Sequence, residues 1–173
     1  MPNKSFYQIH AKANQGDNTK AAAEIMIYSP IGSSWWEETV DAKSFIDDLN
    51  ALNVDEITVR ISSIGGSVAD GIAIYNALKR HKAHITTCND GIAYSIAGLI
   101  LMAGDTVQMA ENAHFMIHAP WTYADGNAAQ LRQVADMLDS WSTAMASSYA
   151  NKSGKSKEEI LAYLTDGQDH FFT

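Results

Sequence analysis

The chain has little cysteine, little proline and few basic residues, and these shortages exclude several classes of protein. Its single cysteine, Cys88, rules out an internal disulfide, which suits a reducing compartment. With only 3 prolines it has no proline-rich linker. Lysine and arginine number 12 against 20 aspartates and glutamates, so the formal net charge is −8. We therefore expect neither nucleic acid nor an anionic membrane as the main partner.

Long apolar runs are missing as well. The longest, 92–103, is interrupted by Tyr94, Ser95 and Gly98, and it is shorter than the roughly 20 apolar residues of a bilayer span. Residues 1–16 mix polar and charged side chains and do not resemble a signal peptide. A cytoplasmic protein is the expectation.

What the chain does contain is the composition of one globular domain. Its 173 residues are 46% hydrophobic and 18% charged, enough for one sizeable core. Residues 1–20 are polar apart from a strand-like patch at 6–10, so we predict a flexible N-terminal arm followed by a single domain over 21–173.

Short strands and helices alternate along that domain, which predicts a layered α/β fold with mostly parallel strands. Asp90-Gly91 and Asp125-Gly126 are predicted as turns, and Asn127 and Ser156 as helix caps. The predicted strands are 23–28, 56–61, 84–89, 106–109 and 114–119, and the predicted helices are 40–52, 68–79, 94–102, 127–152 and one that begins after Ser156.

Paired glycines follow the strand at 56–61. Gly65 and Gly66 stand directly before a helix, where backbone N–H groups can hold a phosphate or an oxyanion. A plain strand-to-helix turn is an equal alternative. The dinucleotide glycine spacing and the lysine of a phosphate-binding loop are both absent, so no nucleotide cofactor is expected.

Ser95 lies between a predicted strand and a helix, with small residues two positions to either side (Ala93 and Ala97). A nucleophile elbow needs this arrangement because bulky neighbours block its tight turn. The alternative is a simple helix cap, which is far commoner.

His118 lies near the end of the predicted strand 114–119, just before Pro120. Four residue steps along a strand place His114 and His118 about 13 Å apart, too far to share a metal ion. No metal is therefore expected.

A serine hydroxyl becomes a strong nucleophile when histidine takes its proton, an acid orients the ring and backbone amides receive the oxyanion. Ser95, His118, Gly66 and a later acid could fill these roles.

Four ordered segments resemble motifs of the Clp protease proteolytic subunit (ClpP) family. They are Ile61-Ser62-Ser63-Ile64-Gly65-Gly66-Ser67, the stretch from Gly91 to Gly104, Met116-Ile117-His118, and Ser153-Gly154-Lys155-Ser156. The resemblance covers about 25–173. It departs at Ile64, where the family has proline, at Tyr94, where it has a smaller residue, and at Thr173, beyond which it continues with a final helix and strand.

This resemblance implies a ClpP/crotonase-like layered fold with a protruding handle helix, and a serine endopeptidase that cuts unfolded or assembly proteins. Ser95 would be the nucleophile, His118 the base, and the N–H groups of Gly66 and Ile96 the oxyanion hole. The acid would come from 164–170, with Asp166 as first choice and Asp169 as second.

Partners follow from the same resemblance. The family forms stacked seven-membered rings, often fed by an AAA+ unfoldase, so any use of ATP would come from that partner. The helix at 127–152 matches the ring-to-ring handle, and its apolar stripe fits a contact between subunits or ordinary intrachain core equally well. That stripe is Leu131, Val134, Met137, Leu138 and Trp141.

Details at 33–36, Trp121 and 126–127 are most similar to the phage and prophage branch, which matures proheads by cutting scaffold and capsid-assembly proteins. Two alternatives stay open: a non-catalytic phage-head assembly module with a vestigial triad, and a crotonase-like acyl-CoA enzyme, which does not need Ser95 and His118 in this order.

Overall fold

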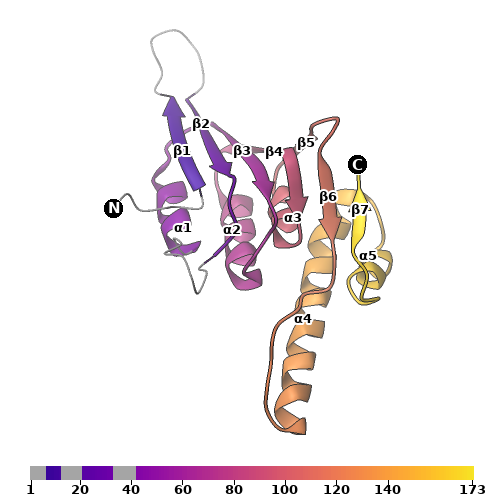
Figure 1. Cartoon of the computed structure of the whole chain (residues 1–173). Coiled ribbons are helices and arrows are strands. Elements are labelled where there is room, and N and C mark those ends of the chain that lie inside the picture. Colours follow the sequence, from indigo (N-terminus) through magenta and orange to yellow (C-terminus); the bar gives the residue numbers. More distant parts are fainter. Residues whose placement is uncertain (1–6, 13–20, 33–41) are drawn as a thin grey trace. The chain divides into compact units, whose positions relative to one another are not determined.

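The computed structural model of the chain describes residues 7–12, 21–32 and 42–173 (Figure 1). It divides into two compact units, one of residues 1–115 with Thr173 and one of residues 116–172. Each unit is described by itself. The motif at 33–36 and the rest of the predicted N-terminal arm, 1–6 and 13–20, lie outside the described residues.

The first unit is built on a mostly parallel sheet. Strands β2, β3, β4 and β5 pair in that order and in parallel, while β1 pairs antiparallel with β2. Buried and partly exposed residues alternate along β2 and most of β3, because successive side chains of a strand point to opposite faces. The strands are β1 (Tyr7–Lys12), β2 (Ala22–Ile27), β3 (Glu56–Ser63), β4 (His84–Tyr94) and β5 (Thr106–Met109).

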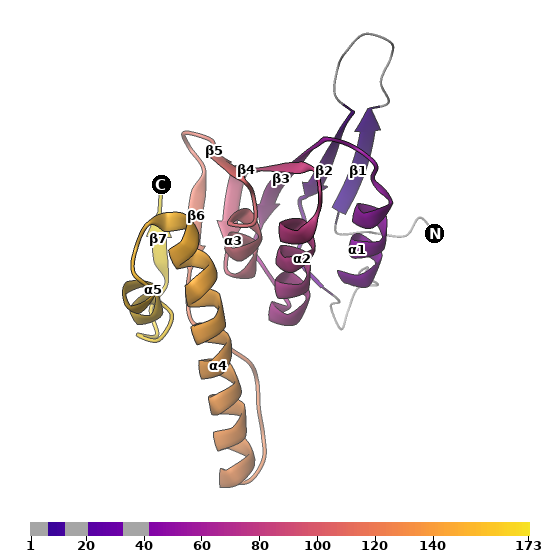
Figure 2. The same ribbon diagram turned by 180° about the vertical axis from the view of Figure 1, so that it is seen from behind.

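Three helices cover one face of this sheet, α1 (Ala42–Ala51), α2 (Val68–Arg80) and α3 (Ile96–Leu101) (Figures 1 and 2). Gly71 lets α2 approach α3 closely, since a Cβ there would lie 2.1 Å from Cγ1 of Ile96. The largest fully buried side chains fill this layer: Ile25, Ile27, Phe45, Leu49, Ile57, Ile61, Ile74, Leu78, Ile85, Ile96, Leu99 and Ile100.

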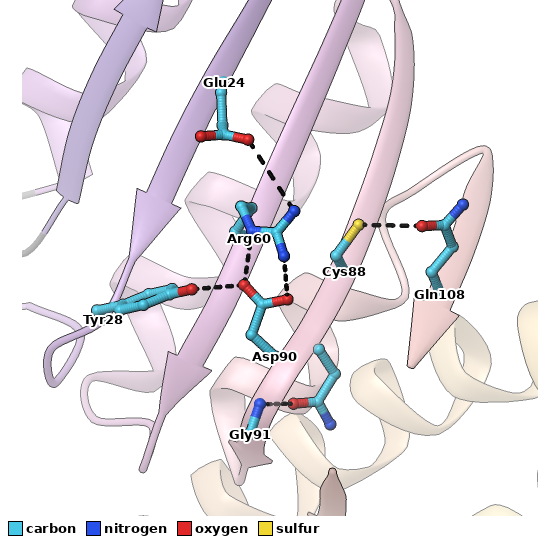
Figure 3. A network of polar contacts seen from close by, with 8 residues as sticks. Glu24, Tyr28, Arg60, Cys88, Asp90, Gly91 and Gln108 are labelled. Atoms are coloured by element: carbon cyan, nitrogen blue, oxygen red, sulfur yellow. Dashed lines mark hydrogen bonds and ion pairs between the residues drawn. The ribbon is translucent and has the colours of Figure 1, made fainter. Parts of the chain in front are cut away.

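The opposite face of the sheet carries a polar network (Figure 3). Arg60 donates from Nε and Nη2 to the two carboxylate oxygens of Asp90, at 2.7 and 2.6 Å, and the hydroxyl of Tyr28 donates to the same carboxylate. The hydrogen bond to Asp90 raises the pKa of Tyr28. These hydrogen bonds pair the charges of Arg60 and Asp90, which offsets the free-energy cost of partly removing them from water.

The second unit contains a long helix and a short helix. Strand β6 (His114–Ile117) begins in the first unit and ends in the second, where β7 (His170–Phe172) lies beside it. Helix α4 (Ala128–Ser153) begins with a capping box between Asn127 and Gln130. Helix α5 (Lys157–Tyr163) begins with another, between Ser156 and Glu159.

The apolar stripe of α4 is not intrachain core over the first half of the helix. The side chains that α4 buries, Ser142, Met145, Ala146 and Tyr149, all lie in its second half, whereas Leu131 and Met137 are exposed. No helix in the described part of the chain is both long and apolar enough to cross a membrane.

The predicted α/β class with mostly parallel strands is confirmed, and the strand at 106–109 has the predicted bounds. Two predictions were wrong. Asp90-Gly91 is not a turn, because β4 continues to Tyr94 with a register shift against β3. Residues 7–12 are not part of a loose arm, because they form β1, whose Tyr7 is buried and donates a hydrogen bond to Asp48.

Candidate active site

Ser95 has an unusual backbone conformation. It lies between β4 and α3 with φ 55° and ψ −128°, and it is the one non-glycine residue with positive φ in the described part of the chain. A side chain in this region of φ/ψ space is strained, and a nucleophile elbow carries such strain to expose its serine. Ser95 occupies the cap position of α3, but its side chain makes no capping hydrogen bond. The simple cap is therefore the weaker interpretation.

The Gly65–Gly66 turn packs directly against Ser95. A Cβ built on Gly65 would lie 2.7 Å from the carbonyl oxygen of Tyr94 and 2.8 Å from Cβ of Ser95, and the φ of Gly65 is +92°. Only glycine fits both the space and the conformation. The structure thus brings together two of the predicted segments that lie about 30 residues apart in the sequence.

The backbone of this turn is fixed by neighbouring polar groups. Ser63 accepts from the N–H of Gly65 at 3.2 Å and donates to the carbonyl of Ser29 at 2.8 Å. The N–H of Ile31 donates to the carbonyl of Gly65, and the N–H of Ser67 donates to the carbonyl of Ile31, so these two hydrogen bonds flank Gly66 in a parallel bridge. In such a bridge the N–H of Gly66 points away from Ile31, so the turn presents that donor on its other side.

The predicted second donor is the N–H of Ile96, the first residue of α3. The first N–H groups of a helix have no partner within the helix. Its position is fixed as well, since the Ile96 side chain is buried against Gly71.

Asn89 and Phe115 hold the start of β6 within the first unit. The buried Asn89 side chain donates from Nδ2 to the carbonyl of His114 at 2.9 Å and accepts from the N–H of Gly91 at 3.2 Å. The ring of Phe115 lies 2.8 Å from where a Cβ of Gly98 would be. The sequence reasoning missed Asn89, because its strand also carries the polar residues Thr86, Thr87 and Asp90 and nothing in the sequence marks Asn89 among them.

His118 bonds to Asp169 in the second unit. Their atoms Nδ1 and Oδ1 are 3.0 Å apart, and the side chains are 19% and 55% exposed. A carboxylate only accepts hydrogen bonds, so Nδ1 carries the proton. The lone pair of a neutral imidazole is then on Nε2, which makes Nε2 the basic atom.

Asp166, the first-choice acid, bonds elsewhere. Its carboxylate accepts from the N–H of Gln168 at 2.9 Å and from Nε2 of His170 at 2.9 and 3.1 Å. The bond from Gln168, then that from His170, lowers the pKa of Asp166. The second choice, Asp169, is the residue that the structure brings to His118.

The Clp protease family matches the chain over residues 16–173. The chain belongs to the Clp protease family. A curated relative, the ATP-dependent Clp protease proteolytic subunit 2 of Tropheryma whipplei (strain Twist), is 28% identical over 149 residues, which cover 80% of this chain and 81% of the relative.

This match confirms the predicted resemblance, and the Clp protease family is a family of peptidases. It also favours peptide-bond hydrolysis over crotonase-like acyl-CoA chemistry. The phage and prophage branch stays a prediction.

Among the described residues no cluster of three histidine, cysteine, aspartate or glutamate side chains could hold a metal ion. Cys88 is buried, and desolvation raises the pKa of its thiol, which disfavours the reactive thiolate.

Proposed function

We propose that the chain is a serine endopeptidase with Ser95 as nucleophile, His118 as general base and Asp169 as orienting acid. The observation that carries this proposal is the strained backbone of Ser95 with the Gly65–Gly66 turn packed against it. Strain of this kind persists where the surrounding structure enforces it, and it clusters at active sites.

In the proposed reaction, Nε2 of His118 takes the proton of the Ser95 hydroxyl as the oxygen attacks the peptide carbonyl. The His118 ring becomes positively charged, and the carboxylate of Asp169 stabilises that charge through the Nδ1 hydrogen bond. The same proton is then given to the leaving amine, and water hydrolyses the acyl-enzyme with the ring again acting as base.

The N–H groups of Gly66 and Ile96 would receive the negative charge on the carbonyl oxygen. Both belong to segments that lie beside Ser95. Donors fixed in advance cost no reorganisation when the charge develops, and one such donor is typically worth about 10²- to 10³-fold in kcat.

The proposal requires His118 to reach Ser95, and chain connectivity supports this. Phe115 packs against Gly98, which follows Ser95 by three residues on α3. His118 follows Phe115 by three residues, a span of at most about 10 Å for an extended chain.

The proposed substrates are extended polypeptides, either unfolded proteins or assembly proteins. The chain itself is proposed to form the family's stacked rings, heptameric or of other size. The exposed first half of α4 supports association between copies, as do the exposed Trp121 and Tyr123 on the segment before it. Large apolar surfaces of this kind usually mark an interface. An AAA+ unfoldase, or phage scaffold and capsid proteins, would be further partners.

The test is peptide or casein hydrolysis by the assembled chain and three variants. Ser95→Ala and His118→Ala should each lose roughly 10⁴-fold or more in kcat. At an Nδ1–Oδ1 distance of 3.0 Å, and with the carboxylate half exposed, the charge interaction is about 2–3 kcal/mol, so Asp169→Asn should lose roughly 30- to 150-fold. Parental turnover in His118→Ala would show that the base is misassigned.

The second candidate is a non-catalytic module of a phage head, because the Asp169 side chain that would complete the triad is 55% exposed and is weakly oriented. It predicts that the assembled parent and Ser95→Ala are equally inert. Measurable turnover that disappears in Ser95→Ala excludes it.

A further inference from the structure

A second aspartate–histidine pair lies next to the proposed triad. The residues that flank Asp169 are Gln168 and His170, and both bond to the carboxylate of Asp166. One carboxylate therefore holds the chain on both sides of the residue that contacts His118.

We infer that Asp166 and His170 form a clamp that positions Asp169 for its contact with His118. This clamp, the Asp166–His170 clamp, rests on the proposed function. Neither residue touches the reacting atoms in this inference, so both are positioning residues.

Asp169 needs such support because of where it lies. Its side chain is 55% exposed, and it precedes β7, a strand of three residues. An exposed ion pair does not by itself fix the orientation of its side chains, because water competes for both partners and the side chains keep their freedom. The direction of the Asp169 side chain must then come from its backbone.

The loop is built to fix that backbone. Gly167 has φ +76°, the left-handed conformation that lets Asp166 accept from the N–H of Gln168 two residues on. The ring of His170 is held from its other side by Tyr163 of α5, with the ring centroids 4.6 Å apart. The two donors also lower the pKa of Asp166, which extends to lower pH the range in which its carboxylate is ionised.

Two variants of His170 separate its hydrogen bond from its ring. His170→Phe keeps an aromatic ring against Tyr163 and removes the donor to Asp166. His170→Gln keeps a donor at a similar reach and removes the ring. Asp166→Ala removes the same contact from the other end, which keeps the inference testable if His170→Phe fails to fold.

For an exposed contact of this kind we expect His170→Phe and Asp166→Ala to lower kcat about 3- to 10-fold with KM within about twofold, and His170→Gln to stay within about twofold of the parent. In an Asp169→Asn background His170→Phe should have no further effect, because residues that act through one group are not additive. His84→Phe is the matched control, since His84 faces Asp105 at 3.7 Å in the first unit, and it should leave kcat unchanged.

The outcomes separate the clamp from the triad. If Ser95→Ala and Asp169→Asn lose turnover while His170→Phe and Asp166→Ala do not, only the clamp is wrong. If His170→Phe lowers kcat by the same factor in the Asp169→Asn background as in the parent, the role of His170 is structural and the clamp is also wrong. If Asp169→Asn keeps the parental kcat, the triad acid and the clamp fall together.

Discussion

Replacing Ser95 by glycine should stabilise the protein relative to replacing it by alanine. The reason is the backbone at φ 55° and ψ −128°, which costs a residue with a Cβ about 1–3 kcal/mol. Alanine retains that cost and glycine does not. In the opposite direction, glycine lowers the free energy of unfolding by about 0.4–1 kcal/mol, because it gives the unfolded chain more conformational freedom.

The difference should be about 1–2 kcal/mol in favour of Ser95→Gly, or a melting temperature higher by about 2–8 °C for a chain of this size. Thermal unfolding followed by circular dichroism at one protein concentration measures it. Both variants lack the hydroxyl, so catalysis does not enter the comparison.

Ser140 provides the control, because it is an exposed residue inside α4. There alanine should be more stable than glycine by about 1 kcal/mol, the ordinary order in a helix. If the same order held at position 95, the strained elbow would be refuted, and with it the main support for Ser95 as nucleophile.

Three further predictions concern other parts of the chain. Gly65→Ala places a Cβ 2.8 Å from that of Ser95 and should lower kcat roughly 10²-fold by displacing the oxyanion turn; unchanged kcat in a folded sample would contradict that role. Cys88, buried with a raised pKa, should react with a disulfide reagent at pH 8 at least roughly tenfold more slowly than in the unfolded chain, and an equal rate would mean that this sheet face opens. Met137→Lys should reduce the mass of the assembly seen by light scattering while Gln133→Glu, off the apolar stripe, should not, and equal masses would exclude that stripe as an interface.

Local patterns predicted the elements that local chemistry determines. The capping boxes at Asn127 and Ser156 depend on residues three positions apart, so the starts of α4 and α5 could be read from the sequence. Ser95 was found because an elbow requires small neighbours. The family followed from the order and spacing of four motifs.

Contacts between distant residues decided the rest. Asp90-Gly91 is typical of a turn, but Arg60 from β3 pairs with Asp90 and allows β4 to continue. Asp166 and Asp169 lie in one short loop, and either could face His118 by spacing alone. The choice between them depends on the turn at Gly167, which the sequence reasoning had no means to orient.

Labelling by a fluorophosphonate probe, located by mass spectrometry on the assembled protein, tests the central claim most directly. The account predicts one modified residue, Ser95, whose modification is abolished in Ser95→Ala and slowed by orders of magnitude in His118→Ala. Absence of labelling in an assembled sample, or equally fast labelling in His118→Ala, would contradict it.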